Sequence, residues 1–279
     1  MDTPAATAPR ASYDLRRDGF TISHAVHSPA RVREAREQLA QIIGYAELAL
    51  EDPFGAYYLR HRSDQGALYD VLQRHPGFWD IAQAPAVLDA IASELGEDLF
   101  MYENSVVYKP KGKRNAVPYH QDFISRPEEP RKLIAWTALD DVTIETGAMR
   151  VLPGSHVHGF LPWHRVKGET HHDRILPEAL PDIEPQYAVL APGDVLVFNQ
   201  LLVHGSDEVH TDSLRVAFRV SYQGFDRINV PRGSPIVLRG GDPAALQRRF
   251  PRRHDDLPRP KVAFWRRGLR KVGRVLSRI

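Results

Sequence analysis

The chain contains no cysteine among its 279 residues. This absence excludes disulfide bonds, thiolate zinc sites, iron–sulfur clusters and cysteine nucleophiles. A metal site in this protein must therefore be built from histidine and carboxylate side chains. Long apolar runs are also lacking, because none approaches the roughly 18 residues that a membrane-spanning helix needs. We expect a cytoplasmic protein.

Composition divides the chain into three segments. Residues 1–12 are rich in alanine, proline and threonine and lack the apolar core of a signal peptide, which predicts a disordered lead. With 42% hydrophobic residues the chain can bury a sizeable core, and we expect one domain over residues 13–247. Residues 248–279 hold 12 Lys or Arg against two acids, which leaves 25 basic and 33 acidic residues before them. A basic tail on an acidic body is typical of an interaction segment.

Short apolar runs broken by turn residues dominate the sequence from Leu99 onward. They cover residues 99–108, 133–139, 148–152, 195–203 and 214–223. Runs of this length without long helices between them favour a β-sandwich or jelly roll over a doubly wound sheet. Residues 155–186 hold five histidines among prolines and charges, and we expect a long loop there, over one end of the barrel.

The flanking segments carry signals for a strand and for helices. A short strand is predicted over Gly19–Ile22, and helices are predicted from Pro29 to Ile43 and from Ala86 to Leu95, where Gly96 ends the pattern. The chain is expected to become helical again after Gly240. The fold class predicted is therefore mainly β with flanking helices.

The pattern His-x-Asp offers an imidazole and a carboxylate to one metal ion, because residues two apart on a strand point to the same face. It occurs four times, beginning at His120, His171, His210 and His254. His171 falls in the predicted loop, His210 in a charged turn and His254 in the basic tail. The pair His120 and Asp122 lies between two β-rich runs, which places it at the mouth of the barrel.

A third ligand is available at His204, directly after the apolar run 195–203. Two histidines and one carboxylate on one side of an iron ion leave its other positions open for a co-substrate and oxygen. An acidic co-substrate needs a cation, and arginine suits a carboxylate because its planar fork donates two parallel hydrogen bonds. Arg215 and Arg219 lie on one face of the strand after His204, so either can serve by geometry, and a surface ion pair is the alternative for each.

Four motifs in this order resemble the phytanoyl-CoA dioxygenase family over about residues 14 to 230. They are His120-Gln121-Asp122, Ala135-Trp136-Thr137-Ala138, Gly147-Ala148-Met149-Arg150-Val151-Leu152-Pro153-Gly154-Ser155-His156, and His204-Gly205-Ser206 followed by Arg215. The resemblance implies a double-stranded β-helix (cupin-like jelly roll) whose iron ligands are His120, Asp122 and His204. It also implies Arg215, rather than Arg219, as the residue that binds 2-oxoglutarate.

By the same resemblance Trp136 and Ser206 should line the co-substrate pocket. The alternatives are a core tryptophan and a turn serine. Lys109-Pro110 should precede the turn into the first ligand strand. Family members that halogenate carry a small residue in place of the carboxylate ligand, and Asp122 is present here. Hydroxylation is therefore the expected outcome.

The expected activity is that of an iron(II)- and 2-oxoglutarate-dependent dioxygenase that uses O2 to hydroxylate a small-molecule or lipid-linked intermediate. The alternatives are desaturation, epimerisation or ring formation with the same cofactors, and a non-catalytic cupin-like binding protein. We expect no nucleic-acid partner and a monomer or weak dimer. Two basic groups are interpreted as solvated charge, and a site for an anionic substrate is the alternative. They are Arg60, His61 and Arg62, and, before the ligand strand, Lys109, Lys111, Lys113 and Arg114.

Residues 261–279 combine an apolar stripe with a basic surface. The stripe, with spacings of three and four residues, consists of Val262, Trp265, Leu269, Val272, Leu276 and Ile279. The remaining faces carry Arg266, Arg267, Arg270, Lys271, Arg274 and Arg278. This pattern predicts a helix that either lies on an anionic membrane as a peripheral anchor or packs its stripe on the acidic body.

Overall fold

The computed structural model describes residues 12–51, 60–62, 66–109, 116–167, 173–211, 215–228 and 236–249. The predicted lead, up to residue 11, and the tail beyond residue 249 lie outside the described residues, so their predictions stay untested.

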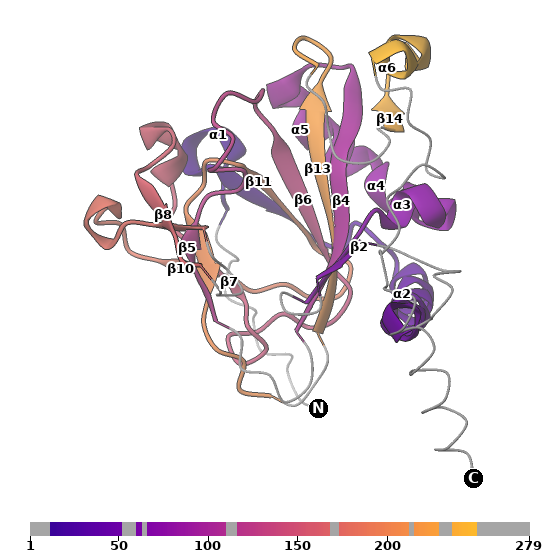
Figure 1. Ribbon diagram of the computed structural model, residues 1–279, viewed down its shortest axis with the longest axis horizontal. Coiled ribbons are helices and arrows are strands. Elements are labelled where there is room, and N and C mark those ends of the chain that lie inside the picture. The colour runs from indigo at the N-terminus through magenta and orange to yellow at the C-terminus, as the bar shows by residue number, and fades with distance from the viewer. Residues whose placement is uncertain are drawn as a thin grey trace, which may run out of the picture.

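Two antiparallel sheets face each other, as Figure 1 shows. The large sheet contains eight strands within the described residues. Its order is β1 (Phe20–Ser23), β11 (Val195–Asn199), β6 (Leu133–Ala138), β13 (Arg215–Gly224), β4 (Leu99–Lys109), β3 (Ala67–Tyr69) and β2 (Arg60–Arg62), with β14 (Ile236–Arg239) also paired to β4. The small sheet has the order β10 (Gln186–Ala188), β7 (Met149–Val151), β12 (His204–Ser206) and β5 (Val117–His120). This arrangement confirms the predicted jelly-roll architecture.

Helices flank the sheets. They are α1 (Leu15–Asp18), α2 (Pro29–Glu51), α3 (Val71–Arg74), α4 (Trp79–Ala82), α5 (Pro85–Leu95) and α6 (Pro243–Arg249), with short 3-10 turns at Pro76–Phe78, Ser155–His158 and Pro177–Ala179. Helix α5 begins with Pro85, whose fixed φ suits a first helical position, and ends before Gly96, whose φ is 87°. Figure 1 shows α2, α3 and α4 on the side of the large sheet away from the small sheet.

The central strands supply two hydrophobic cores from their two faces. On β6, Leu133 and Ala135 pack with apolar residues of α2 and α5, while Ile134, Trp136 and Ala138 belong to the cluster between the sheets. All six residues of this strand are buried. Covering a sheet on both faces requires nearly continuous apolar runs rather than alternation, which is the pattern that made these strands predictable.

Two sequence expectations need correction. The run 195–203 is not one strand, because β11 ends at Asn199 and the chain turns before β12 begins at His204. The segment 155–186 is not only loop, since it also contains a two-stranded hairpin of β8 (Trp163–Arg165) and β9 (Asp173–Ile175). Residues 168–172, which connect these two strands in the sequence, lie outside the described residues.

Candidate metal centre

The pairing of two short strands brings the three predicted metal ligands together. His120 is the last residue of β5 and His204 is the first residue of β12, and the two lie directly opposite each other in the antiparallel register. Asp122 lies just beyond the strand, in the following turn, instead of on the strand as predicted. One ligand atom from each of the three side chains lies within 4.8 Å of the others. Among the described residues this is the one group of histidine and acidic side chains with such geometry.

Both histidine rings leave the same nitrogen, Nε2, available to a metal. Nδ1 of His120 is 3.0 Å from the carbonyl oxygen of Pro118, and Nδ1 of His204 is 2.9 Å from that of Leu202. A carbonyl only accepts hydrogen bonds, so each Nδ1 carries the proton and Nε2 keeps its lone pair for a metal. Burial lowers the pKa of His204 to about 4, which keeps its ring neutral at physiological pH.

The carboxylate of Asp122 is ionised and held by a cation. Burial by itself raises its pKa, but the charge and hydrogen bond of Arg219, together with the effects of His204 and His120, outweigh burial and the pKa falls to about 2. Nη2 of Arg219 donates a hydrogen bond of 2.8 Å to Oδ2 of Asp122. Two neutral imidazoles and one ionised carboxylate are a donor set that suits a divalent transition metal such as iron(II).

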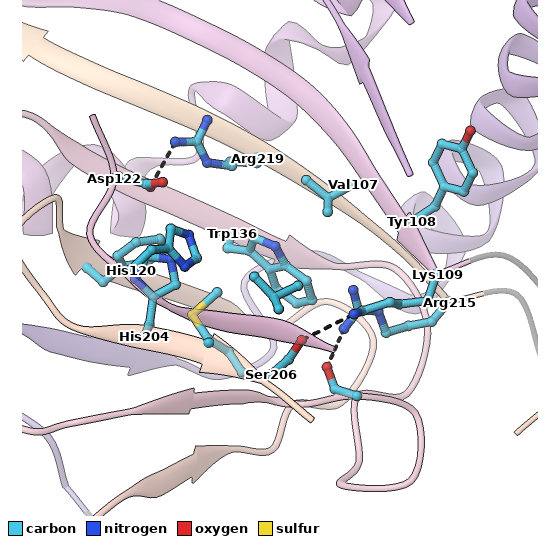
Figure 2. Close-up of a pocket in the computed structure, with 15 residues that line it drawn as sticks. Val107, Tyr108, Lys109, His120, Asp122, Trp136, His204, Ser206, Arg215 and Arg219 are labelled. Carbon is cyan, nitrogen blue, oxygen red and sulfur yellow. Dashed lines mark hydrogen bonds and ion pairs between the residues drawn. The ribbon is translucent and has the colours of Figure 1, made fainter. Parts of the chain in front are cut away.

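The other end of the same pocket is lined by buried cations. Figure 2 shows His120, Asp122 and His204 at one end and Lys109, Ser206 and Arg215 at the other. The cavity between them has a volume of about 150 Å³. Its walls also include Val107, Trp136, Met149 and Phe198. A small anion that reaches from the cations to the metal ligands fits this shape.

Arg215 is 4% exposed and points into the pocket. Nη1 donates to the carbonyl oxygen of Gly147 at 2.6 Å, while the buried Nε has no hydrogen-bond partner among the described residues. Burial lowers the pKa of Arg215 to about 10, so the side chain stays charged. Its Cζ lies 5.1 Å from the ring centre of Trp136, a cation–π distance. A buried cation with an unused donor is suited to bind a carboxylate.

Lys109 is the pocket residue that the sequence interpretation missed. It was interpreted as solvated charge, but it is 5% exposed, and its Nζ lies 3.2 Å from Oγ of Ser206. Burial, together with the positive charge of Arg215, lowers the pKa of Lys109 to about 7. Strand β4 extends to Lys109, one residue past the predicted end, and places it opposite Arg215. The apolar residues Val106, Val107 and Tyr108 directly before the lysine were the signal available in the sequence.

The two arginines proposed as carboxylate anchors have different partners in the structure. The guanidinium of Arg219 is taken by two carboxylates, Asp122 at 2.8 Å and Glu103 at 3.4 Å, so it is not available as the anion anchor. Arg215 faces the pocket together with Trp136 and Ser206, the two residues expected to line it.

Some candidates fall outside what the structure describes. They are His171, Asp212, the His254 and Asp256 pair, Pro110, Lys111, Lys113, Arg114, and the side chains of Arg60 to Arg62. Of the loop histidines, His156 is used locally, since its Nε2 lies 3.1 Å from the carbonyl oxygen of Arg16.

Comparisons with known sequences agree with the motifs. A family model described as phytanoyl-CoA dioxygenase (PhyH) matches residues 15–217. The chain is 28% identical over 152 residues to the peroxisomal phytanoyl-CoA dioxygenase of Rattus norvegicus, a match that covers 51% of this chain and 44% of the relative. It is 24% identical over 273 residues to an ectoine dioxygenase of Sphingopyxis alaskensis, covering 88% and 87% of the two chains. The chain thus spans about half the length of the phytanoyl-CoA dioxygenases it matches.

Solved structures share the fold. The non-heme monooxygenase ThoJ in its apo form matches with a TM-score of 0.62 at 23% identity, covering 94% of this chain and 98% of that one. The epimerase SnoN, in complex with Fe3+, alpha ketoglutarate and nogalamycin RO, matches with a TM-score of 0.59 at 20% identity, covering 89% of each chain. At these identities the likeness shows the cupin-like fold that the motifs implied.

Proposed function

Because the chain belongs to the phytanoyl-CoA dioxygenase family, we propose that it is an iron(II)- and 2-oxoglutarate-dependent dioxygenase. In this proposal it uses O2 to hydroxylate an unactivated C–H bond of a small-molecule or lipid-linked substrate, and it releases succinate and CO2. One observation carries the proposal: a single pocket joins two histidines and a carboxylate at one end to two buried cations at the other.

His120, Asp122 and His204 would hold the iron. Their donor set of two imidazoles and one carboxylate is the one found in non-haem iron(II) oxygenases, and it leaves positions for the co-substrate and oxygen. Iron and the keto acid, when bound, supply the oxidising chemistry, and the residues of the chain supply orientation and a dry pocket. The two carbonyls behind the histidine Nδ1 atoms fix both rings, which keeps the ligands in place throughout turnover.

Arg215, Lys109 and Ser206 would bind the distal carboxylate of 2-oxoglutarate. The unused Nε of Arg215 and the Nζ of Lys109 are buried donors of positive charge, and charge-assisted hydrogen bonds in a buried site are strong. Trp136 forms a flat wall beside Arg215. With one end anchored here, the keto acid end of the molecule is directed along the cavity toward the metal ligands.

Hydroxylation is the outcome we propose, because Asp122 occupies the position that halogenating family members leave open. Desaturation, epimerisation and ring formation use the same cofactors, and proteins with this fold include an epimerase and a carbocyclase by their names. The identity of the product from a substrate library would distinguish these outcomes.

The test of the proposed activity is iron-dependent turnover of 2-oxoglutarate. Purified protein with iron(II), 2-oxoglutarate and a substrate library should consume oxygen and form succinate, and Asp122→Ala should do neither. Arg239→Met is a matched control, since it removes an arginine whose partners Asp89 and Glu97 lie away from the pocket. Absence of iron-dependent succinate formation in the wild type would favour the alternative of a non-catalytic binding module.

We further propose that residues 261–279 attach the enzyme to anionic membranes. Two features of the sequence support this: an apolar stripe containing Trp265 and a dense set of basic residues beside it. Attraction of about 1 kcal/mol per basic residue near an anionic surface suffices for reversible attachment. Among the described helices, none has the length and apolar character that a membrane span requires.

Co-sedimentation with vesicles tests the attachment. Full-length protein should sediment with anionic vesicles, and less so at high salt, while a chain ending at Leu257 should remain in solution. Neutral vesicles are the control. Equal binding by both chains, or none by either, would contradict attachment and favour packing of the stripe on the acidic body.

A further inference from the structure

Arg219 makes its contacts at the metal end of the pocket. It lies in the middle of β13, between Trp136 on β6 and Ser105 on β4 in the sheet register. Its side chain is 12% exposed, so its charge needs partners. Figure 2 shows its guanidinium directed toward Asp122, away from Lys109 and Arg215.

Two carboxylates share this guanidinium. Nη2 donates to Oδ2 of Asp122 at 2.8 Å, and Nη1 lies 3.4 Å from Oε1 of Glu103 on β4. The side chain of Glu103 is 5% exposed. A largely buried cation between two acids has its orientation fixed from both sides, because moving it toward either acid weakens the interaction with the other.

The backbone that follows Asp122 is held by the same side chain. Phe123 has a φ of 59°, in the left-handed region that a non-glycine residue rarely adopts. Its ring centre lies 5.5 Å from Cζ of Arg219, 4.9 Å from Cζ of Arg126 and 4.8 Å from Nζ of Lys132. Such a conformation persists when its surroundings hold it in place. Arg219 thus contacts both the carboxylate of Asp122 and the aromatic ring of the next residue, Phe123.

We infer that Arg219 is a positioning residue that holds Asp122 as a ligand through one oxygen only. The hydrogen bond from Arg219 takes Oδ2, which leaves Oδ1 as the oxygen available to the metal. A carboxylate that binds through one oxygen occupies one position on the metal, and three positions then stay open among six. This inference rests on the proposed metal site and adds to it the residue that keeps those positions free.

The experiment uses a double variant that leaves the net charge of the pocket unchanged. Arg219→Met with Glu103→Met removes one positive and one negative charge and replaces both with apolar side chains of similar length. A change in metal binding then reflects the lost orientation of Asp122 rather than altered charge. The probe is cobalt(II), titrated into full-length protein and followed by its visible absorption bands, which respond to the number and arrangement of ligands.

The double variant is expected to bind cobalt about ten- to a hundred-fold more weakly than the wild type, as is typical for loss of a residue that orients a ligand. Its absorption bands should also change shape. Arg239→Met, whose partners Asp89 and Glu97 lie away from the pocket, should leave both the cobalt affinity and the bands as in the wild type. Thermal unfolding of the metal-free proteins checks that each variant is folded.

Arg219→Lys provides a second variant that keeps the charge if the double variant does not fold. A single ammonium group lacks the fork that reaches both carboxylates, so a loss of affinity and altered bands are expected here too. Wild-type affinity with wild-type bands in the folded variants would overturn the inference and leave the proposed function standing. Failure of the wild type to bind cobalt would overturn both.

Discussion

Binding of 2-oxoglutarate should weaken as the pH rises above neutrality, because Lys109 loses its proton. Burial, together with the charge of Arg215, lowers the pKa of Lys109 to about 7 in the free pocket. Below that pH the pocket presents two cations to the incoming carboxylate. Above it, the neutral amine must take up a proton when the anion binds, and the affinity falls.

The size of the effect follows from the linkage between binding and protonation. A carboxylate beside Lys109 favours the charged amine, so the pKa rises in the complex. Between the pKa of the free pocket and that of the complex, the dissociation constant should increase about tenfold per pH unit, which corresponds to about 1.4 kcal/mol. If the carboxylate restores the pKa of Lys109 to the ordinary value for lysine, affinity should fall about 50-fold between pH 7 and pH 9.

Equilibrium titration of 2-oxoglutarate into protein saturated with nickel(II) measures this dependence without turnover. Lys109→Met is the matched variant, since it removes the amine and keeps a chain of similar length in a buried position. It should bind more weakly than the wild type near pH 6 and show a flat profile above pH 7. A wild-type affinity that is constant over this range, or an equal slope in the variant, would refute the assignment of Lys109 to the anion site.

His120→Ala and Asp122→Ala should lose the visible charge-transfer band that iron(II) and 2-oxoglutarate give in the wild type, because each removes one of three ligands. His171→Ala should keep the band, and the opposite pattern would place the metal at another His-x-Asp pair. Arg215→Ala should weaken 2-oxoglutarate by roughly ten- to a hundred-fold in equilibrium titrations at saturating metal, since a lost charged hydrogen bond costs ~1.5 to 3 kcal/mol. Arg219→Ala should weaken it much less, and a reversed order would move the carboxylate anchor to Arg219.

The strands that the sequence predicted well are those with long apolar runs. Residues 99–109 and 133–138 are buried along almost their whole length. Burial on both faces selects apolar residues at most positions, which makes such strands recognisable in the sequence. The run 195–203 misled the prediction because it continues through a buried turn. Oδ1 of Asn199 accepts a hydrogen bond from the amide of Leu201, and the carbonyl oxygen of Asn199 accepts one from Leu202. An asparagine inside an apolar run was the sign of that turn.

The hairpin within residues 155–186 was missed for a different reason. Its strands β8 and β9 are three residues long each, too short to show a period of two. An ion pair of 2.6 Å between Arg165 and Asp173 joins them across the hairpin. Trp163 and Ile175 lie opposite each other and pack in a small cluster outside the small sheet. A hairpin of this kind is stabilised by contacts between its two strands. The sequence of either strand alone does not reveal those contacts.

The pairing of β13 with β4 accounts for what sequence periodicity left open at the anion site. A period of two places Arg215 and Arg219 on one face and treats them alike. In the structure Arg219 forms ion pairs with Asp122 and Glu103. The register places Arg215 directly opposite Lys109. Like charges opposite each other on neighbouring strands destabilise a sheet, and burying them adds a desolvation cost. An anion bound beside both cations offsets that cost, so the juxtaposition of Lys109 with Arg215 is itself an argument for an anion site, and it becomes visible only once the register is known.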